Sequence, residues 1–247
     1  MGLAHSPRIV TDGLVLCLDA ANPKSYPGTG TVINDLTSGG YNSTLLNGVG
    51  YSSSNNGVLT FDGTNDYIST PFTYANNDDF TMSCWFKAPV AQRCGLIGIR
   101  RGFRTTDWYQ SQIYIAGDAL SDTVGSYLQF SDFVRQSNGS YDAIRTTFTN
   151  TVSVTDNQWK YLVITSDSVG AKIYINAVKI DEAISTPKPT RFEEANFLVG
   201  AAGNWPNNPL SGYYFNGQMS NINFYTKALS AEEIRQNFNA LRGRYGI

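Results

Sequence analysis

The clearest structural signal in the chain lies in the stretch Asp79-Phe80-Thr81-Met82-Ser83-Cys84-Trp85-Phe86-Lys87. Its apolar side chains at positions 80, 82, 84 and 86 alternate with Thr, Ser, Trp and Lys. A β-strand places successive side chains on opposite faces of a sheet, so the four apolar side chains would share one face. The stretch therefore predicts a strand that buries this face in a hydrophobic core.

Strand patterns of this kind recur along most of the chain and are separated by Gly, Asn, Asp and Pro. Asn176-Ala177 is the expected turn of a β-hairpin. About a dozen short strands predict an all-β protein with two stacked antiparallel sheets. We expect strands at 14–18, 58–61, 67–68, 80–87, 96–99, 112–115, 127–130, 143–148, 160–165, 172–175, 178–180, 197–200 and 215–225.

A short α-helix is expected at residues 230–242. Ser230 and Glu233 have the spacing of a capping box, in which each side chain accepts a hydrogen bond from the other residue's backbone N–H. Ile234 and Phe238 begin an apolar stripe at i and i+4, which indicates that one face is buried. We expect this helix to plug one end of the sandwich.

Composition excludes several classes of protein. Of the 247 residues, 41% are hydrophobic and only 15% are charged, with a formal net charge of −2. A disordered chain and a strongly basic nucleic-acid-binding protein are therefore not expected. No apolar run reaches the 18 or more residues of a membrane-spanning helix, so no membrane insertion is expected. The first ten residues lack the apolar region of a signal peptide.

Histidine and cysteine limit the possible chemistry further. His5 is the single histidine, so a zinc site built on several histidines is impossible. Cys17, Cys84 and Cys94 show no C-x-x-C spacing, and three cysteines cannot all pair. We expect them to be small, buried apolar residues.

Four segments in order, 59–68, 79–87, 158–176 and 215–230, carry a family resemblance. Their succession resembles the laminin-G-like branch of the concanavalin A-like lectin/glucanase superfamily over about residues 10–240. The resemblance implies a two-sheet antiparallel jelly-roll sandwich. We expect an N-terminal arm at 1–13 and one laminin-G-like domain at 14–247, which includes the C-terminal helix.

The opening segment 9–22 also resembles the leader of such domains in structural proteins of tailed phages, especially marine and cyanobacterial ones. This resemblance implies a non-enzymatic virion protein, assembled in the host cytoplasm, that decorates a capsid or belongs to a tail or tail fibre. Its expected partners are other virion proteins, further copies of itself as a homo-oligomer, and host glycans. The alternative is a stand-alone carbohydrate-binding lectin module, which could depend on calcium.

Catalytic residues are not expected. Glucanases of the resembling superfamily carry carboxylates in an E-x-D-x-E strand, and a retaining glycosidase needs two carboxyl groups about 5–5.5 Å apart. This chain has five glutamates, and none lies in an alternating acidic strand. The pairs at 181–182 and 193–194 are adjacent in sequence, so within a strand they would face opposite sides.

Two polar loops with tryptophan are the candidate sugar sites, because sugar sites combine an aromatic face with amide groups that bind hydroxyls. Asn204, Trp205 and Asn207 lie in one loop, and Trp108 and Tyr109 lie in the other. The alternative is that each tryptophan is buried and anchors its own loop.

Asp62, Asn65 and Asp66 form the candidate metal site. They offer three oxygen donors within five residues, whereas Ca²⁺ takes six to eight oxygens. We therefore interpret them first as Asx turns and keep calcium as the alternative. No cofactor is required by this interpretation.

Overall fold

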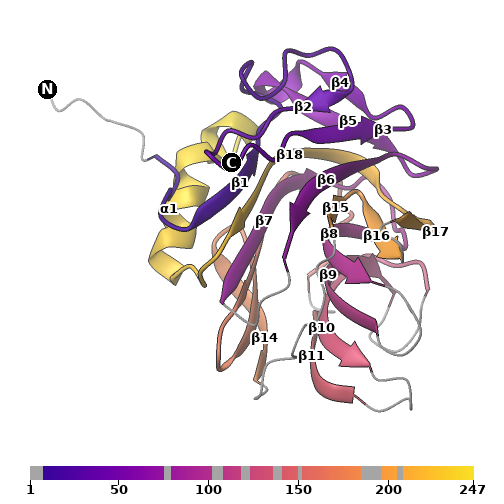
Figure 1. Ribbon diagram of the computed structural model, residues 1–247, viewed down its shortest axis with the longest axis vertical. Helices are drawn as coiled ribbons and strands as arrows, with labels where there is room; N and C mark the ends of the chain where they lie inside the picture. Colours follow the sequence, from indigo (N-terminus) through magenta and orange to yellow (C-terminus); the bar gives the residue numbers. More distant parts are fainter. Residues whose placement is uncertain are drawn as a thin grey trace, which may run out of the picture.

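The computed structural model describes residues 8–74, 79–101, 108–117, 123–135, 141–149, 152–184, 196–204 and 208–247. Within these ranges, two antiparallel sheets share one apolar core and a single α-helix lies near the C-terminus (Figure 1). The expected all-β sandwich with a C-terminal helix is confirmed.

The first sheet has the helix on its outer side. It contains β1 (Leu14–Leu18), β4 (Gly50–Ser52), β5 (Val58–Asp62), β7 (Phe80–Lys87), β12 (Lys160–Ser166), β13 (Gly170–Ile175), β14 (Val178–Ile184) and β18 (Asn216–Tyr225). The strand order is β14-β13-β12-β7-β18-β5-β4, and β1 also pairs with β18. Asn176 and Ala177 form the predicted hairpin turn, with φ of 50° and 64°.

The second sheet has the order β11-β10-β9-β8-β15-β6-β3-β2, and a separate hairpin pairs β16 with β17. Of the described strands, β2, β3, β4, β16 and β17 were not expected, because segments of two to seven residues show too little alternation. The bounds are β2 (Val32–Ile33), β3 (Ser43–Leu46), β6 (Tyr67–Thr73), β8 (Cys94–Arg101), β9 (Trp108–Ala116), β10 (Tyr127–Arg135), β11 (Tyr141–Thr149), β15 (Asn196–Val199), β16 (Ala201–Asn204) and β17 (Asn208–Tyr214).

Strand β7 is buried on both faces. Met82 and Cys84 belong to the core between the two sheets, as the alternation predicts. Trp85 points the other way, into a second apolar cluster on the outer face of the first sheet. Lys87, the last residue of β7, is only partly buried. The outer face of this strand therefore changes from apolar to polar at its end.

The C-terminal helix α1 (Ala231–Leu241) covers this outer face and does not plug an end of the sandwich (Figure 1). The prediction of an end plug was wrong, because the outer face carries Trp85, Tyr161 and Tyr225, whose apolar area must be covered. The capping box is confirmed: Ser230 Oγ accepts from Glu233 N at 3.2 Å, and Glu233 Oε2 accepts from Ser230 N at 2.9 Å.

Both ends of the described chain are tied to this layer. Val10 N donates to Asn237 Oδ1 at 2.7 Å. The 3₁₀ turn η2 (Arg242–Tyr245) follows α1, and Arg244 Nη1 lies 2.8 Å from Asp19 Oδ1. Part of the expected N-terminal arm, from residue 8 onward, therefore contacts the helix, while residues 1–7 lie outside the described residues.

All three cysteines are buried and free, as expected. Burial, together with the neighbouring carboxylates of Asp19 and Asp35, raises the pKa of Cys17 to about 12. None of the helices in the described ranges has the length and hydropathy needed to cross a membrane.

Candidate binding groove

Three polar side chains lie side by side across the outer face of the first sheet. Gln218 of β18 is in register with Thr60 of β5 on one side and with Lys87 of β7 on the other. The adjacent residues Phe86 and Met219 face the core, so the row must face outward. On the outer face of the first sheet, α1 and η2 pack over Trp85. The row lies next to the area that they cover.

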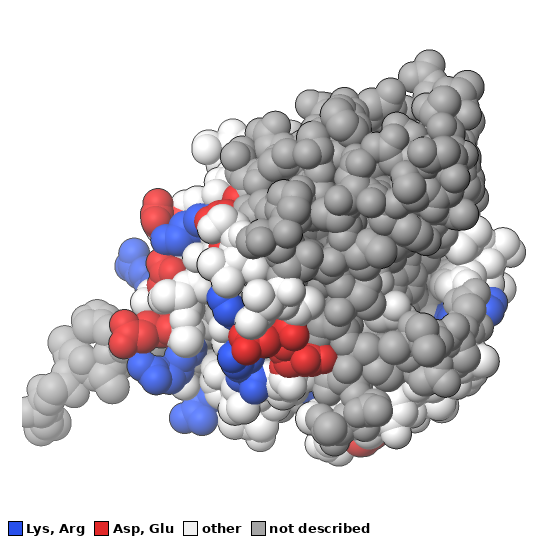
Figure 2. All heavy atoms as spheres, turned by 90° about the horizontal axis from the view of Figure 1, so that it is seen from below, with Lys and Arg blue, Asp and Glu red and all other residues white. Residues whose placement is uncertain are grey.

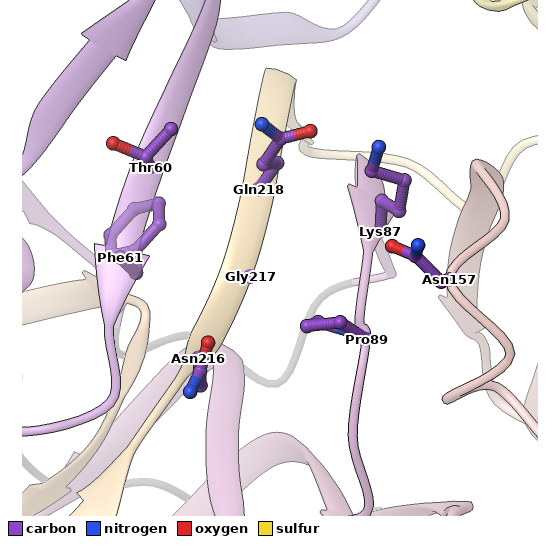
Figure 3. Close-up of a pocket in the computed structure, with 8 residues that line it drawn as sticks. All are labelled: Thr60, Phe61, Lys87, Pro89, Asn157, Asn216, Gly217 and Gln218. Atoms are coloured by element: carbon purple, nitrogen blue, oxygen red, sulfur yellow. The ribbon is translucent and has the colours of Figure 1, made fainter.

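The row lines a pocket of about 290 Å³ (Figure 3). Figure 3 shows Gln218 between Thr60 and Lys87, with Asn216 further along β18. The pocket combines amide, hydroxyl and ammonium groups with two apolar side chains, a composition that can bind a ligand rich in hydroxyl groups. The lining residues are Thr60, Phe61, Lys87, Pro89, Asn157, Asn216, Gly217 and Gln218. We call this pocket, together with the second pocket described below, the groove.

Among the residues that line the groove, Gln218 is the one with a buried side-chain atom that lacks a hydrogen-bond partner. Its Oε1 atom is buried and has no hydrogen-bond partner. Leaving a buried amide oxygen unpaired costs about 1–3 kcal/mol, so such an atom requires an explanation. A ligand that donates a hydrogen bond inside the groove would satisfy it.

The side chain of Gln92 bonds the backbone of Asn216 and not its side chain. The side chain of Asn216 is therefore left available to a ligand. Gln92 Oε1 accepts from Asn216 N at 2.7 Å, and Gln92 Nε2 donates to Asn216 O at 2.9 Å. The next residue, Gly217, has φ of 153°, and a Cβ there would lie 2.4 Å from Lys87 O. Only glycine fits at this position, and its backbone lines the groove.

Lys87 is positioned by an anchored aromatic ring. Its Nζ lies 5.8 Å from the centroid of the Trp159 ring, within the range of a cation–π contact. Trp159 is itself buried, and its Nε1 donates to Asn55 Oδ1 at 3.2 Å. Trp85 and Trp159 therefore serve in packing, and Trp159 also supports the ammonium of Lys87 at the edge of the groove.

A second pocket of about 350 Å³ adjoins the first at Asn216, which lines both. The Arg93 guanidinium lies 4.3 Å from the centroid of the Tyr213 ring. The exposed side chains of Val90 and Val124 add apolar surface to this pocket. Its other lining residues are Asp62, Gly63, Ala91, Gln92, Arg93, Gly212 and Tyr214. Together the two pockets offer a ligand an elongated surface.

The candidate metal residues form hydrogen-bonded turns. Asp62 Oδ1 accepts from Thr64 N at 2.7 Å, and this bond lowers the pKa of Asp62. Asp66 Oδ2 accepts from Asp62 N at 3.0 Å, while Asn65 O accepts from the Asn47 side chain at 2.9 Å. Burial raises the pKa of Asp66, whose Oδ1 has no hydrogen-bond partner. Within the described ranges, no three His, Cys, Asp or Glu side chains are grouped as a metal site.

The described members of the predicted sugar-binding set lie elsewhere, on β9 and β16. Trp108 and Tyr109 are the first residues of β9, and Asn204 is the last residue of β16. Trp205 and Asn207 lie outside the described residues. The expectation that these five residues bind sugar therefore stays a prediction.

The structure does link the two strands that carry these residues. Gln112 of β9 donates from Nε2 to Ala201 O of β16 at 2.8 Å. Its Oε1 also accepts from Gly203 N at 3.3 Å. The Gln112 side chain thus links β9 to β16, although the sequence places the two strands about 90 residues apart.

Sequence reasoning missed the row formed by Thr60, Gln218 and Lys87. Alternation alone could have placed Lys87 on the outer face, two residues after Trp85. It could not show that β18 lies between β5 and β7, because strand pairing across 130 residues leaves no local pattern.

A family profile described as the concanavalin A-like lectin/glucanases superfamily matches residues 62–235 of the chain. This range contains most of both sheets, Lys87 and Gln218. A search of curated protein sequences finds no match.

Several solved structures have a similar fold. The binding domain of Paraclostridial Mosquitocidal Protein 1 is 16% identical with a TM-score of 0.64, covering 92% of this chain and 52% of that one. Domain 4 of the arabinanase AbnA from Geobacillus stearothermophilus, solved with arabinotriose, is 16% identical with a TM-score of 0.61, at coverages of 91% and 97%.

The binding domain of Botulinum Neurotoxin DC, solved in complex with SialylT, is 15% identical with a TM-score of 0.62. The alignment covers 93% of this chain and 52% of that binding domain. The chain thus spans about half of each toxin binding domain and nearly all of the arabinanase domain. At these identities the likeness shows a shared fold.

Proposed function

Because the chain belongs to the concanavalin A-like lectin/glucanases superfamily, we propose that it is a non-catalytic glycan-binding domain whose binding site is the groove. The observation that carries the proposal is the row of Thr60, Gln218 and Lys87, which meets the solvent where the helix cover ends. The buried, unpaired amide oxygen of Gln218 supports it, since a sugar hydroxyl can donate to that atom.

The composition of the groove suits a sugar. Asn157, Asn216 and Gln218 supply amide groups that can both donate to and accept from hydroxyls. Pro89, which is exposed, supplies apolar surface on which the C–H face of a sugar ring can pack. The arabinanase domain, which shares the fold over almost its whole length, was solved with an oligosaccharide bound.

The non-catalytic part of the proposal rests on how Asp62, which lines the groove, and Asp156, which lies next to it in sequence, are bonded. Asp62 is held in a turn by Thr64 N, and Asp156 is paired with Lys160 at 2.6 Å. Neither provides the pair of opposed carboxyl groups that sugar hydrolysis requires. Two of the solved structures with a similar fold named above are binding domains of toxins.

A glycan array followed by titration calorimetry tests the proposal. Gln218→Ala and Asn216→Ala should each weaken binding of the retained glycan about tenfold, the loss expected for a good hydrogen bond in a site. Asn239→Ala, which removes an exposed amide on α1, is the control and should leave affinity unchanged. Circular dichroism verifies that each variant folds.

The residues that the sequence predicts to bind sugar provide an alternative location for the glycan site. Loss of binding in Trp205→Ala or Trp108→Ala, with Gln218→Ala unaffected, would move the site to those residues. Failure to retain any glycan on a broad array would contradict a glycan-binding function altogether.

The opening segment supports a more specific role as a virion structural protein. Its support is the resemblance of residues 9–22 to leaders of phage structural proteins. Residues 14–18 of that segment form β1, which pairs with β18, so the segment is part of the sandwich. Stoichiometric amounts of the chain in purified phage particles would favour this role, whereas a monomer that binds sugar in isolation would favour a stand-alone lectin.

A further inference from the structure

We propose that the groove selects acidic glycans, meaning sugars that carry a carboxylate or a sulfate, and that Lys87 is the residue that selects them. The inference rests on the proposed function and assigns its ligand class. It follows from the charge, position and neighbours of the Lys87 ammonium.

Among the residues that the structure describes, no carboxylate neutralises the charge of Lys87. Lysines 160, 172, 179 and 227 each lie within 3.1 Å of a carboxylate oxygen. Figure 2 likewise shows basic and acidic side chains next to one another on the face that it presents. Lys87 contacts an aromatic ring instead, and no carboxylate in the described ranges pairs with it.

The carboxylate next to the groove in sequence is already neutralised. Asp156 precedes Asn157, which lines the pocket, and Asn157 N donates to Ala88 O of the segment after β7 at 3.0 Å. Both oxygens of Asp156 accept from Lys160 Nζ, at 2.7 and 2.6 Å. Partial burial would raise the pKa of Asp156, but the bonds from Lys160 and Gln158 lower it below its ordinary value. Lys87 therefore remains the unpaired charge of this pocket.

The position of Lys87 favours an ionic bond to a ligand. Its side chain is partly buried, and the field of a charge is screened less there than on open surface. Contact with Trp159 restricts the ammonium of Lys87. Less side-chain entropy is therefore lost when a ligand binds. An ammonium has three donors and no acceptor, so it suits a group that only accepts.

The amides next to Lys87 complete a site for an anion. Gln218 is the cross-strand neighbour of Lys87, and Asn157 lines the same pocket (Figure 3). Their N–H groups can donate to the second oxygen of a carboxylate or to further oxygens of a sulfate. The remaining groups, Thr60 and Asn216, stay available for hydroxyls of the same glycan.

Matched ligand pairs test the inference. Trigalacturonic acid is compared with its methyl ester, and sulfated isomaltohexaose with the unsulfated sugar, alongside acidic and neutral members of the array. The protein should prefer the acidic member at least about tenfold, as expected for a charged hydrogen bond, and the preference should shrink as salt is raised. Preference for only one of the two acidic groups identifies the anion that the groove accepts.

Three variants separate the inference from the proposed function. Lys87→Gln should abolish the preference, so that the acidic and neutral members of each pair bind with equal affinity, while Lys87→Arg should keep the preference. Lys24→Gln removes one exposed positive charge outside the groove and is the control.

The outcomes are distinguishable. Equal binding of acidic and neutral members by the wild type, or a preference that survives in Lys87→Gln, would overturn the acidic selectivity and leave glycan binding intact. If Gln218→Ala weakens neither member of a pair, the groove itself is not the site and both proposals fail.

Discussion

The rings of Trp85 and Tyr245 stack with their centroids 4.1 Å apart, which places the last turn of the chain directly on β7. Trp85 is fully buried beneath it, although it faces away from the core between the sheets. The sandwich therefore has a third layer, made of α1 and η2, and the extent of this layer determines where the exposed groove begins.

Removing the stacked ring should destabilise the protein strongly. Tyr245→Ala would open a cavity above Trp85, and we expect a loss of about 3 kcal/mol in the free energy of unfolding. Tyr245→Phe keeps the ring and should cost less than about 1 kcal/mol. Urea denaturation measures both. Equal losses in the two variants would show that the hydroxyl, rather than the ring, accounts for the effect.

Two residues of the helix should differ in their contribution. The apolar stripe alone suggests that Phe238 is buried, with a cost of about 3–5 kcal/mol for truncation to alanine. In the structure Phe238 is only partly buried at the edge of the Trp85 ring, whereas Ile234 is fully buried. We now expect about 2 kcal/mol for Phe238→Ala and about 3 kcal/mol for Ile234→Ala. A larger loss for Phe238→Ala in the same denaturation series would contradict this order.

The capping box should make stability depend on pH. Partial burial would raise the pKa of Glu233, but hydrogen bonds from Lys227 and Ser230 hold it below its ordinary value. The ionised Glu233 side chain therefore contributes its full stabilisation of the folded state above about pH 4.3, the pKa of glutamate in an unfolded chain. This stabilisation is lost as the pH falls through the lower pKa that Glu233 has in the folded state.

The variant Glu233→Gln measures this contribution. It should be less stable than the wild type by about 1 kcal/mol at pH 7, and the difference should shrink toward pH 3. Glu232→Gln, on the exposed side of the same turn, is the matched control. A difference that stays constant from pH 7 to pH 3 would exclude ionisation as its cause.

Calcium provides a direct test of the turn at residues 62–66. We expect the melting temperature to be unchanged by a chelator, because one oxygen of Asp62 and one oxygen of Asp66 already bond within the turn. The alternative predicts that millimolar Ca²⁺ raises the melting temperature, since a bound ion stabilises the folded state. If that rise occurs and disappears in Asp66→Asn, the unpaired Oδ1 of Asp66 is a calcium ligand.

Much of the fold could be predicted because its signals are local. The alternation in 80–87, the hairpin at Asn176-Ala177 and the capping box of Ser230 each depend on neighbours within a few residues. These elements form where expected. The buried, unpaired cysteines follow from their number and spacing alone.

Strand order and the location of the helix required the tertiary structure. A pattern in one segment states that a face is buried but not what buries it, and for Trp85 the partner lies 160 residues further along the chain. The groove has the same origin: Thr60, Lys87 and Gln218 are ordinary polar residues in sequence. They become a row because β18 pairs with β5 and β7 at once, and long-range pairing of this kind reflects the packing of the whole core rather than any local preference.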